Sequence, residues 1–570
     1  MLGTASPRTR ALAGGDLALV VVIAVVVGVV ATVWLAGELA ALVTSGHTIA
    51  VGPGELGRVL ARLPEHLDDP ARAWPADARR SLPGPAGCYL AAFVVTIALG
   101  GGMVALVRAW RSPALGGRDR RGSRWANAGD LRRLRVRTAT PGRLTLGRVG
   151  RGLVATEKRH SAIVIAPTQS LKTTGLAVPA LLEWHGPVLA ASIKTDLVHH
   201  THRARRKAGE VMIFDPADTT GMRRASWTPL ADCSSWQGAR RTADRLAQAG
   251  APSPRSLEEA DFWSKAGAKF LAPLLFAGAL DGRTIADVVH WVDGEAAGQR
   301  EVRDILTANQ TAPEPERDAA LAAAGAVWGA DERLRSSLYM TAAVALDAYG
   351  DPAVIDCSQQ SELSADWLLA GGTRTAYLCA PQDEQQRLRP LFVTLIASVL
   401  SEVYERATRT GQPLDPPLLV VLDEVANIAP LPDLDALASS AAGQGIQLVT
   451  VVQDLAQMRS RWGDRATTIV NNHRAKLIGT GISDTETLDY VARLLGDQEI
   501  PQISATADHT GRRSSTESST FRDLAPAHLV REARPGTAVL IYGHLPPARL
   551  RLRPWFSDRA LTRLVQAPGS

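Results

Sequence analysis

Residues 161–182 (SAIVIAPTQSLKTTGLAVPALL) constrain the fold of this chain more than any other segment. A short apolar run leads into a tight loop, and Lys172 and Thr173 then open a helix-like run. A strand, a loop, a Lys-Thr pair and a helix in this order form the layout of a phosphate-binding loop. In such a loop, backbone N–H groups and the helix N-terminus hold phosphate oxygens, the lysine adds a charge, and the next hydroxyl binds Mg²⁺.

The match to this loop pattern is incomplete. Ala166 and Leu171 stand where the pattern G-x-x-x-x-G-K-[ST] requires glycine, so an ordinary strand-turn-helix is the alternative. The candidate phosphate-binding residues are Ala166, Pro167, Thr168, Gln169, Ser170, Leu171, Lys172, Thr173 and Thr174.

Two further apolar runs end in polar residues of the right chemistry. Residues 417–424 (PLLVVLDE) end in Asp423 and Glu424, and residues 446–453 (IQLVTVVQ) end in Gln453. In nucleotide motors an acid at a strand end holds Mg²⁺, and a neighbouring glutamate polarises the attacking water. Each run alone also fits a strand that simply reaches solvent. Three such strand ends in one chain indicate a nucleotide-binding α/β core.

Composition limits the other possibilities. At 570 residues the chain is long enough for two or three domains. Its four cysteines are widely scattered, so neither a disulfide framework nor a Cys-type zinc site is indicated. The net charge of +6 comes from 63 basic and 57 acidic residues, so the location of the basic residues matters more than their number.

Two uncharged runs near the N-terminus are long enough to cross a membrane as helices. They cover residues 17–37 and 88–107, which are 21 and 20 residues long. A cleaved signal peptide is the alternative for the first run, but a second span follows it. We therefore expect a membrane anchor over residues 1–107, with a short external loop at 44–87.

The flanking charges predict the orientation. Residues 108–151 carry 13 arginines against only Asp119 and Asp130, whereas the 44–87 loop has no net bias. The positive-inside rule therefore predicts that both termini are cytoplasmic. The arginine-rich segment either is this topology signal, resting on anionic headgroups, or forms a collar over which a polyanion passes.

The rest of the chain alternates strands and helices, as parallel α/β folds do. Strands are expected near 161–166, 187–193, 210–214, 374–380, 417–424, 446–453, 475–479 and 538–542, the last closing the sheet. Lys194 and Asp196 follow one of them and lie either at the ligand-binding edge or at an exposed helix start. The polar segment 503–520 is expected to be a loop.

This pattern predicts the domain organisation. A basic juxtamembrane linker covers 108–150, and a nucleotide-binding α/β motor domain is built from 151–235 and 351–570. Residues 236–350 form an all-α inserted domain, because strand signals vanish there.

Several segments, taken together and in order, resemble the coupling ATPases of conjugative type IV secretion, the TraG/TraD family. They are the loop APTQSLKTTGLAVPALL, SIKTDLVHHT, FDPAD, WTPL, DFWSKAGAKFLAPLL, RLRPLF, LLVVLDEVANIAPLPDL, GIQLVTVVQDLAQM and GTGISDTETLDY. With the two N-terminal spans, the resemblance covers nearly the whole chain.

The resemblance implies a RecA/FtsK-like P-loop motor domain with an all-α insertion, behind two transmembrane helices. It implies a hexameric ring at the inner membrane that uses ATP and Mg²⁺ to deliver relaxase-bound single-stranded DNA to a secretion channel. Carried over by position, Lys172 would bind the β/γ-phosphates, and Thr173 and Asp423 would hold Mg²⁺. Glu424 would position the water, and Gln453 would sense the γ-phosphate.

The chain departs from the family pattern at three points. Leu171 and Ala166 replace loop glycines, and Ala442 stands where relatives carry a basic residue that reaches the neighbouring subunit's phosphate. Two alternatives therefore stay open. One is a non-catalytic membrane docking receptor for secretion substrates, with weak or no ATP turnover. The other is a double-stranded DNA pump of the FtsK type, against which the helical insertion argues.

Overall fold

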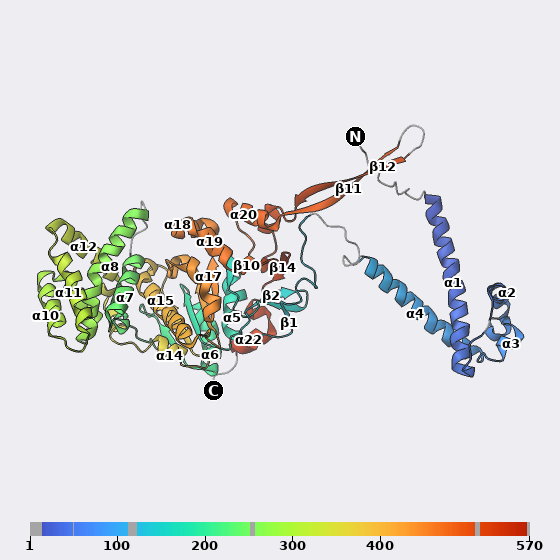
Figure 1. Ribbon diagram of the computed structural model, residues 1–570, viewed down its shortest axis with the longest axis horizontal. Helices are drawn as coiled ribbons and strands as arrows, with labels where there is room; N and C mark the ends of the chain where they lie inside the picture. Colours follow the sequence, from blue (N-terminus) through green and yellow to red (C-terminus); the bar gives the residue numbers. More distant parts are fainter. Residues whose placement is uncertain (1–13, 50, 112–121, 251–256, 508–512, 567–570) are drawn as a thin grey trace. The chain divides into compact units, whose positions relative to one another are not determined.

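The computed structural model describes residues 14–49, 51–111, 122–250, 257–507 and 513–566 (Figure 1). The chain divides into two compact units, Met1–Arg120 and Arg121–Ser570.

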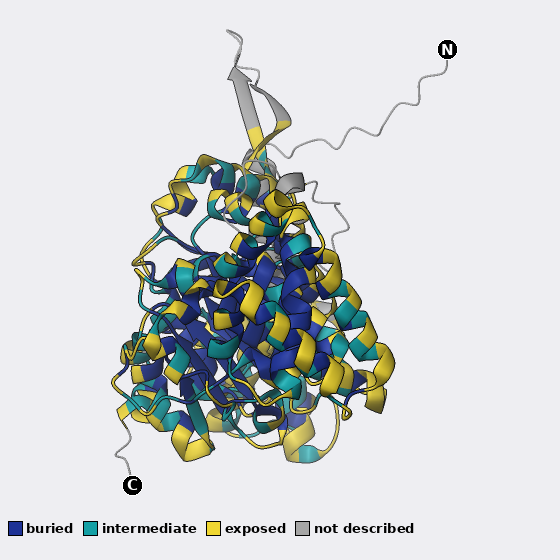
Figure 2. Cartoon of the chain, turned by 90° about the vertical axis from the view of Figure 1, so that its left-hand side faces the viewer, coloured by how far each residue is buried: buried dark blue, intermediate teal, exposed yellow. Residues whose placement is uncertain are grey.

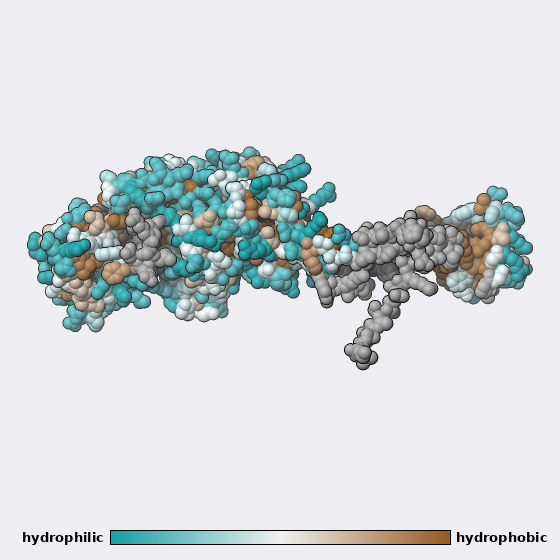
Figure 3. Space-filling model, turned by 90° about the horizontal axis from the view of Figure 1, so that it is seen from above, coloured by the Kyte–Doolittle hydropathy of each residue, from teal (hydrophilic) through white to brown (hydrophobic). Residues whose placement is uncertain are grey.

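The N-terminal unit contains two long helices, α1 (Gly14–Ser45) and α4 (Pro85–Arg111). Their segments Val26–Ser45 and Pro85–Val104 are long and apolar enough to cross a membrane. Large apolar side chains such as Val27, Phe93 and Ile97 are exposed on them, and Figure 3 shows hydrophobic surface on this unit. Exposed apolar helix faces of this kind suit a lipid environment.

The segment between these helices is folded. It contains α2 (Pro53–Arg62), η1 (Leu63–His66), η2 (Pro70–Ala73) and α3 (Ala76–Arg79). Trp74 packs against α1 at Gly37, where an added Cβ would lie 2.2 Å from the indole ring. A glycine at this place therefore allows the segment to pack closely on α1.

The second unit is built on a twelve-stranded sheet with the order β1-β3-β2-β14-β13-β10-β4-β9-β8-β5-β7-β6. Its strands are β1 (Arg135–Val136), β2 (Thr145–Val149), β3 (Gly152–Ala155), β4 (Ala162–Ile165), β5 (Val188–Ser192), β6 (Val211–Phe214), β7 (Thr375–Cys379), β8 (Leu418–Asp423), β9 (Ile446–Val452), β10 (Ala475–Ile478), β13 (Thr537–Tyr542) and β14 (Ala548–Arg551). From β10 to β6 neighbouring strands are parallel, whereas β13 pairs antiparallel with β10.

Two sequence-based expectations about this sheet are wrong. The strand predicted at 538–542 does not close the sheet, because β14, β2, β3 and β1 continue beyond it. The segment predicted as a linker over 108–150 supplies β1 and β2, so its C-terminal part belongs to the sheet. Both errors arise because short antiparallel strands carry a weak apolar signal.

Helices cover both faces of the parallel part of the sheet, and the strands are buried (Figure 2). On one face lie η3 (Thr173–Ala177), α5 (Val178–Glu183), α6 (Asp196–Ala208) and α22 (Arg559–Gln566). On the other lie α15 (Gln385–Thr410), α16 (Val425–Ile428), α17 (Leu434–Gln444), α18 (Leu455–Trp462), α19 (Arg465–Asn472) and α20 (Thr485–Leu495). Burial on both faces explains why these strands are continuous apolar runs.

The elements described between residues 236 and 350 are all helical. They are α7 (Trp236–Gly250), α8 (Leu257–Leu280), α9 (Ile285–Asp293), α10 (Ala296–Ala308), α11 (Glu314–Trp328), α12 (Glu332–Leu346) and η5 (Asp347–Gly350). Two shorter helices, α13 (Pro352–Asp356) and α14 (Ala365–Leu369), follow.

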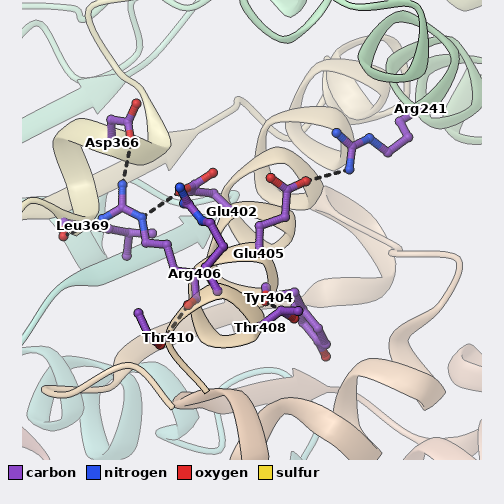
Figure 4. Close-up of polar contacts among 10 residues, drawn as sticks. Arg241, Asp366, Leu369, Glu402, Tyr404, Glu405, Arg406, Thr408 and Thr410 are labelled. Carbon is purple, nitrogen blue, oxygen red and sulfur yellow. Dashed lines mark hydrogen bonds and ion pairs between the residues drawn. The ribbon is translucent and has the colours of Figure 1, made fainter. Parts of the chain in front are cut away.

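Helix α15 joins this helical part to the sheet. Its Glu405 accepts from Arg241 of α7 at 2.7 Å, while its Arg406 donates to Asp366 at the start of α14 and to Glu402 (Figure 4). The buried residues of α7 and α15 also belong to one hydrophobic cluster. The helical part is therefore packed onto the motor sheet through α15.

The segment 503–520, expected to be a loop, is a β-hairpin in its described part. β11 (Asp497–Ala507) pairs antiparallel with β12 (Arg513–Asp523) over eleven residues each. The two strands form a sheet of their own that projects from the unit (Figure 1). β12 is rich in Ser and Thr, and β11 alternates only Pro501, Ile503, Ala505 and Ala507 with polar residues, so the overall polarity indicated a loop although the backbone pairs.

Candidate active site

The polar strand ends singled out in the sequence meet at one edge of the sheet. The strands from β10 to β6 are parallel, so their carboxyl ends share this edge. Ala166 follows β4, Gln453 follows β9, and Asp423 ends β8. Parallel α/β sheets bind ligands at this edge.

The loop after β4 is a tight structure with two left-handed residues. Gln169 and Leu171 have φ values of +63° and +64°. The Ser170 hydroxyl donates to the Pro167 carbonyl at 2.7 Å, and the Gly175 N–H donates to the Leu171 carbonyl at 2.7 Å. Leu171 thus adopts the backbone conformation for which the loop pattern uses glycine, which costs a residue with a Cβ roughly 1–2 kcal/mol.

Lys172 is buried at the end of this loop. Its Nζ donates to the Ala166 carbonyl at 3.4 Å and lies 3.6 Å from Glu424 Oε1. Both charged side chains are only 6% exposed. The ammonium and the carboxylate are thus held together across 252 positions of sequence, because the loop after β4 faces the end of β8.

Asp423 contacts the residue that follows this lysine. The Thr173 hydroxyl donates to Asp423 Oδ2 at 2.9 Å, and the Ser192 hydroxyl donates to the same oxygen at 3.4 Å. Burial raises the pKa of Asp423 to about 6, although the Thr173 hydrogen bond and the Lys172 charge favour the ionised form. The second oxygen, Oδ1, is buried without a hydrogen-bond partner.

These residues fit a magnesium ion that is shared with phosphates. A buried carboxylate oxygen without a partner is costly unless a cation or a donor meets it. Mg²⁺ prefers oxygen ligands and is usually held by one or two protein groups together with waters and substrate phosphates. The Asp423 carboxylate and the Thr173 hydroxyl, which are hydrogen-bonded to each other, could supply such a pair.

Glu424 is the first residue beyond β8. It is buried, and its φ of +62° is in the left-handed region. The Asn427 side-chain amide donates to its Oε2 at 3.3 Å, while Oε1 faces Lys172. This turn directs the Glu424 carboxylate to the loop, where it can accept a proton from a water once Lys172 moves away.

Gln453 lies beside the loop. The Ala166 N–H donates to the Val452 carbonyl at 3.1 Å, so the residue after β9 is adjacent to the first residue of the loop. The Gln453 N–H donates to Gln457 Oε1 at 3.0 Å, which orders the turn into α18. An amide at this place can contact a phosphate held by the loop.

Sequence reasoning missed two contacts of the carboxylates, Ser192 and Asn427. Ser192 ends β5 directly opposite Asp423 in the parallel register. The same strand-end rule that selected Asp423 could have found it, but a serine there is a weak signal. Asn427 lies in the first turn of α16, where no pattern distinguishes it.

The structure also places Lys194 and Asp196. Lys194 is exposed, and Asp196 opens α6 as an early helix acid. Burial, and to a lesser degree the charge of Asp196, raises the pKa of Asp423. Asp196 therefore lies close to the site while it also begins the helix.

Comparison with known proteins shows the family of this chain. Residues 124–569 match the family model described as "Type IV secretory system Conjugative DNA transfer". The chain is 24% identical over 460 residues to Protein VirD4 of Agrobacterium fabrum, covering 78% of this chain and 67% of the relative. It is 25% identical over 418 residues to the conjugal transfer protein TraG of the same organism, covering 69% of this chain and 60% of the relative.

A solved structure has the same fold. The plasmid coupling protein TrwB in complex with ADP and Mg²⁺ superposes with a TM-score of 0.56 at 18% identity, over 76% of this chain and 94% of TrwB. The expected P-loop motor fold, preceded in the sequence by two apolar N-terminal helices, is therefore confirmed. Because the matched model spans most of the sequence, the chain belongs to the type IV secretory system conjugative DNA transfer family, the TraG/VirD4 coupling proteins.

Proposed function

We propose that this chain is an inner-membrane coupling ATPase that delivers relaxase-bound single-stranded DNA to a type IV secretion channel. The observation that carries the proposal is the convergence of Lys172 and Thr173 with Glu424 and Asp423 at one sheet edge. A structural relative was solved with ADP and Mg²⁺, which supports ATP and Mg²⁺ as the ligands here. The chain spans about two thirds of VirD4, so the activity of the whole relative is part of this proposal.

The roles of the residues follow from their contacts. Lys172 would leave Glu424 and the Ala166 carbonyl and donate to the β/γ-phosphates. Thr173 and Asp423 would hold Mg²⁺, which when bound neutralises phosphate charge. Glu424, freed from the lysine, would orient and deprotonate the attacking water, and Gln453 would contact the γ-phosphate.

Because Lys172 would exchange its partners, nucleotide binding would have to precede activation of Glu424 in this mechanism. While the loop is empty, the lysine neutralises Glu424 at 3.6 Å, and a paired carboxylate is a poor base. Only an anion that competes for the ammonium releases the carboxylate. Nucleotide binding would therefore switch the base on.

The assembly and topology belong to the same proposal. We expect a homo-hexamer with both termini in the cytoplasm and the loop 44–87 outside, and the division into anchor, motor and all-α insertion described above. Ala442 follows the buried Ala441 near the end of α17 and offers no cation. Any arginine acting on a neighbouring subunit's phosphate would come from elsewhere in the chain.

The test is nucleotide binding and hydrolysis by the full chain in detergent or nanodiscs. We expect wild-type protein to bind Mg-ATP and to hydrolyse it faster with single-stranded DNA, and Lys172→Ala to lose both. Lys269→Ala removes an exposed lysine on α8 and serves as the matched control. A rate of ATP hydrolysis that does not change with single-stranded DNA or with Lys172→Ala would reject the proposal that this chain is a DNA-translocating motor.

One observation favours a second candidate, a docking receptor without turnover. Leu171 carries a branched side chain at a position for which the phosphate-binding pattern uses glycine, and it holds a strained φ. Tight ATP binding by the wild-type chain would remove the ground for this candidate.

A further inference from the structure

At the antiparallel end of the sheet, one face is only partly covered, and we call it the open face. Along β13, Ala538, Leu540 and Tyr542 are buried, whereas Val539 and Ile541 between them are only partly buried. The buried side packs with the α5 face of the sheet. The other side borders a groove of about 640 Å³, lined also by α21 (Ala527–Arg531) and the loop before β13.

Four arginines lie on this open face, which we call the arginine face: Arg148, Arg534, Arg549 and Arg551. Directly opposite residues of antiparallel strands point to the same side of a sheet. Arg551 is opposite both Thr537 and Arg148, and Arg549 is opposite Val539. The register therefore brings together Arg148 and Arg551, which are 403 positions apart in the sequence.

The charge of the arginine face is largely uncompensated. Arg148 pairs with Asp558 at 3.0 Å. Arg534, Arg549 and Arg551 are exposed and form no ion pair with an acidic residue that the structure describes. The Arg549 guanidinium lies 4.3 Å from the centroid of the Trp125 ring. The face thus presents a cationic surface with an aromatic residue at its margin.

The positive-inside rule does not account for these arginines. That rule counts basic residues within about 15–20 residues of a span. Arg534, Arg549 and Arg551 lie hundreds of residues after α4 and reach this place only through folding. Their position therefore requires another explanation.

The covalent connection between the membrane anchor and the groove is short. Trp125 borders the groove, and α4 ends at Arg111, 14 residues earlier. A fully extended chain covers at most about 3.6 Å per residue, so the connection spans no more than about 50 Å. The cytoplasmic leaflet is anionic and attracts basic groups, and tryptophan is enriched at membrane interfaces.

We propose that the arginine face docks on the anionic phospholipid headgroups of the membrane that holds α1 and α4. The phosphodiester groups of the lipids are the ligands, and Arg534, Arg549 and Arg551 are the main contacts. The proposal requires that α1 and α4 span the bilayer, but it does not depend on ATP turnover.

Single-stranded DNA carries the same phosphodiester chemistry but fits the arginine face less well. Proteins that hold single strands stack successive bases on several free aromatic rings. Among the described residues that line the groove, Trp125 is the single aromatic one, and Arg549 already covers its ring. A headgroup surface needs charge alone, which this face supplies.

The test uses the full chain in nanodiscs of neutral phosphatidylcholine, with or without anionic phosphatidylglycerol. A donor dye is placed on Leu529→Cys, an exposed position in the groove, in a Cys88→Ala background, since the other cysteines are buried. Energy transfer to a headgroup-labelled lipid reports docking. The reference dye position is Met340→Cys, exposed on α12.

We expect higher transfer from Leu529→Cys in anionic discs than in neutral discs, and no such difference from Met340→Cys. Each arginine near an anionic surface contributes about fivefold, so changing Arg534, Arg549 and Arg551 to Gln should weaken docking roughly a hundredfold. High salt should also abolish it. Changing the exposed Arg240, Arg300 and Arg333 to Gln provides a charge-matched control that should leave docking intact.

Equal transfer in neutral and anionic discs, or docking unchanged in the triple Gln variant, would overturn the proposal. A labelled single-stranded oligonucleotide provides the competing test in neutral discs. If the triple variant weakens its binding while lipid charge has no effect, the arginine face is a nucleic-acid surface and the lipid proposal fails. Unchanged thermal unfolding of the variants excludes misfolding as the cause.

Discussion

At the scale of single residues, Leu171 is the clearest departure from an ordinary phosphate-binding loop. Its φ of +64° is the conformation that glycine adopts at no cost, and its side chain approaches Gly536 before β13. We predict that Leu171→Gly tightens Mg-ATP binding by about tenfold, equivalent to about 1.4 kcal/mol, because strain and bulk leave the loop. Isothermal titration calorimetry with Mg-ATP compares the dissociation constants of the wild type and Leu171→Gly.

Leu171→Ala is the matched control for that prediction. It removes the bulk but keeps a Cβ in the left-handed region, so it should gain less affinity than glycine. If Leu171→Gly binds nucleotide no better than the wild type, and both bind hardly at all, the docking-receptor candidate is favoured instead.

A second prediction at this scale concerns His473, which is fully buried between β9 and α19. Its ring nitrogens contact the Thr450 hydroxyl at 2.9 Å and the Ile469 carbonyl at 2.8 Å. Burial lowers the pKa of His473 to about 4. The unfolded chain therefore binds the proton first, and stability present above pH 6.5 is lost as the pH falls towards 4.

We expect the wild-type free energy of unfolding to fall by up to about 3 kcal/mol over this window because of His473 alone. His473→Asn cannot take up the proton, so its urea-unfolding curves should depend less on pH between 6.5 and 4. The same slope in both proteins would show that the histidine does not contribute.

At the scale of elements, one arginine joins α5, β5 and β7. Arg205 of α6 is 2% exposed, and burial lowers the pKa of its guanidinium. It donates to the Trp184 carbonyl at 2.6 Å, the Gly186 carbonyl at 2.9 Å and the Thr375 hydroxyl at 2.7 Å. The cation therefore satisfies the carbonyls that α5 leaves open where the chain turns into β5.

We predict that Arg205→Met destabilises the protein by about 3 kcal/mol, because several buried acceptors lose their donor. Arg206→Met, an exposed neighbour on the same helix, should change stability by less than about 0.5 kcal/mol. Thermal or denaturant unfolding of the two variants compares them directly. Equal effects would mean that the loss reflects helix propensity and not the buried contacts.

At the scale of the whole molecule, we predict that the folded segment between the two candidate spans lies on the opposite side of the membrane from the motor. Asp68 is exposed in that segment, and Met340 is exposed in the helical part of the second unit. In a Cys88→Ala background, Asp68→Cys should react with a membrane-impermeant maleimide in intact spheroplasts. Met340→Cys should react only after detergent.

Labelling of Met340→Cys in intact spheroplasts would place the motor outside and contradict the charge-based orientation. Labelling of neither residue before detergent would show that the segment between α1 and α4 is also internal. The first result would remove the basis for an inner-face motor, and the second would remove the basis for an external segment between two spans.

The sequence by itself determined the parallel motor core. The strands β4, β8 and β9 are apolar on both faces, and β8 and β9 lead directly into polar residues, a local pattern that survives in any tertiary context. Asp423 and Glu424 could be selected for the same reason, since they end such a run, and Lys172 could be selected because it opens a helix after the loop that follows β4. The two N-terminal spans were equally visible, because hydrophobic length is a property of the local chain alone.

Tertiary structure alone decided what depends on contacts between distant segments. The β11–β12 hairpin has only a weak apolar alternation, confined to β11, so cross-strand pairing defines it. Ser192 becomes a partner of Asp423 only through the β5–β8 register, and the arginine face arises because β14 lies between β2 and β13. Local patterns encode which residues enter a core, whereas strand order and register place polar side chains together, and no short segment carries that information.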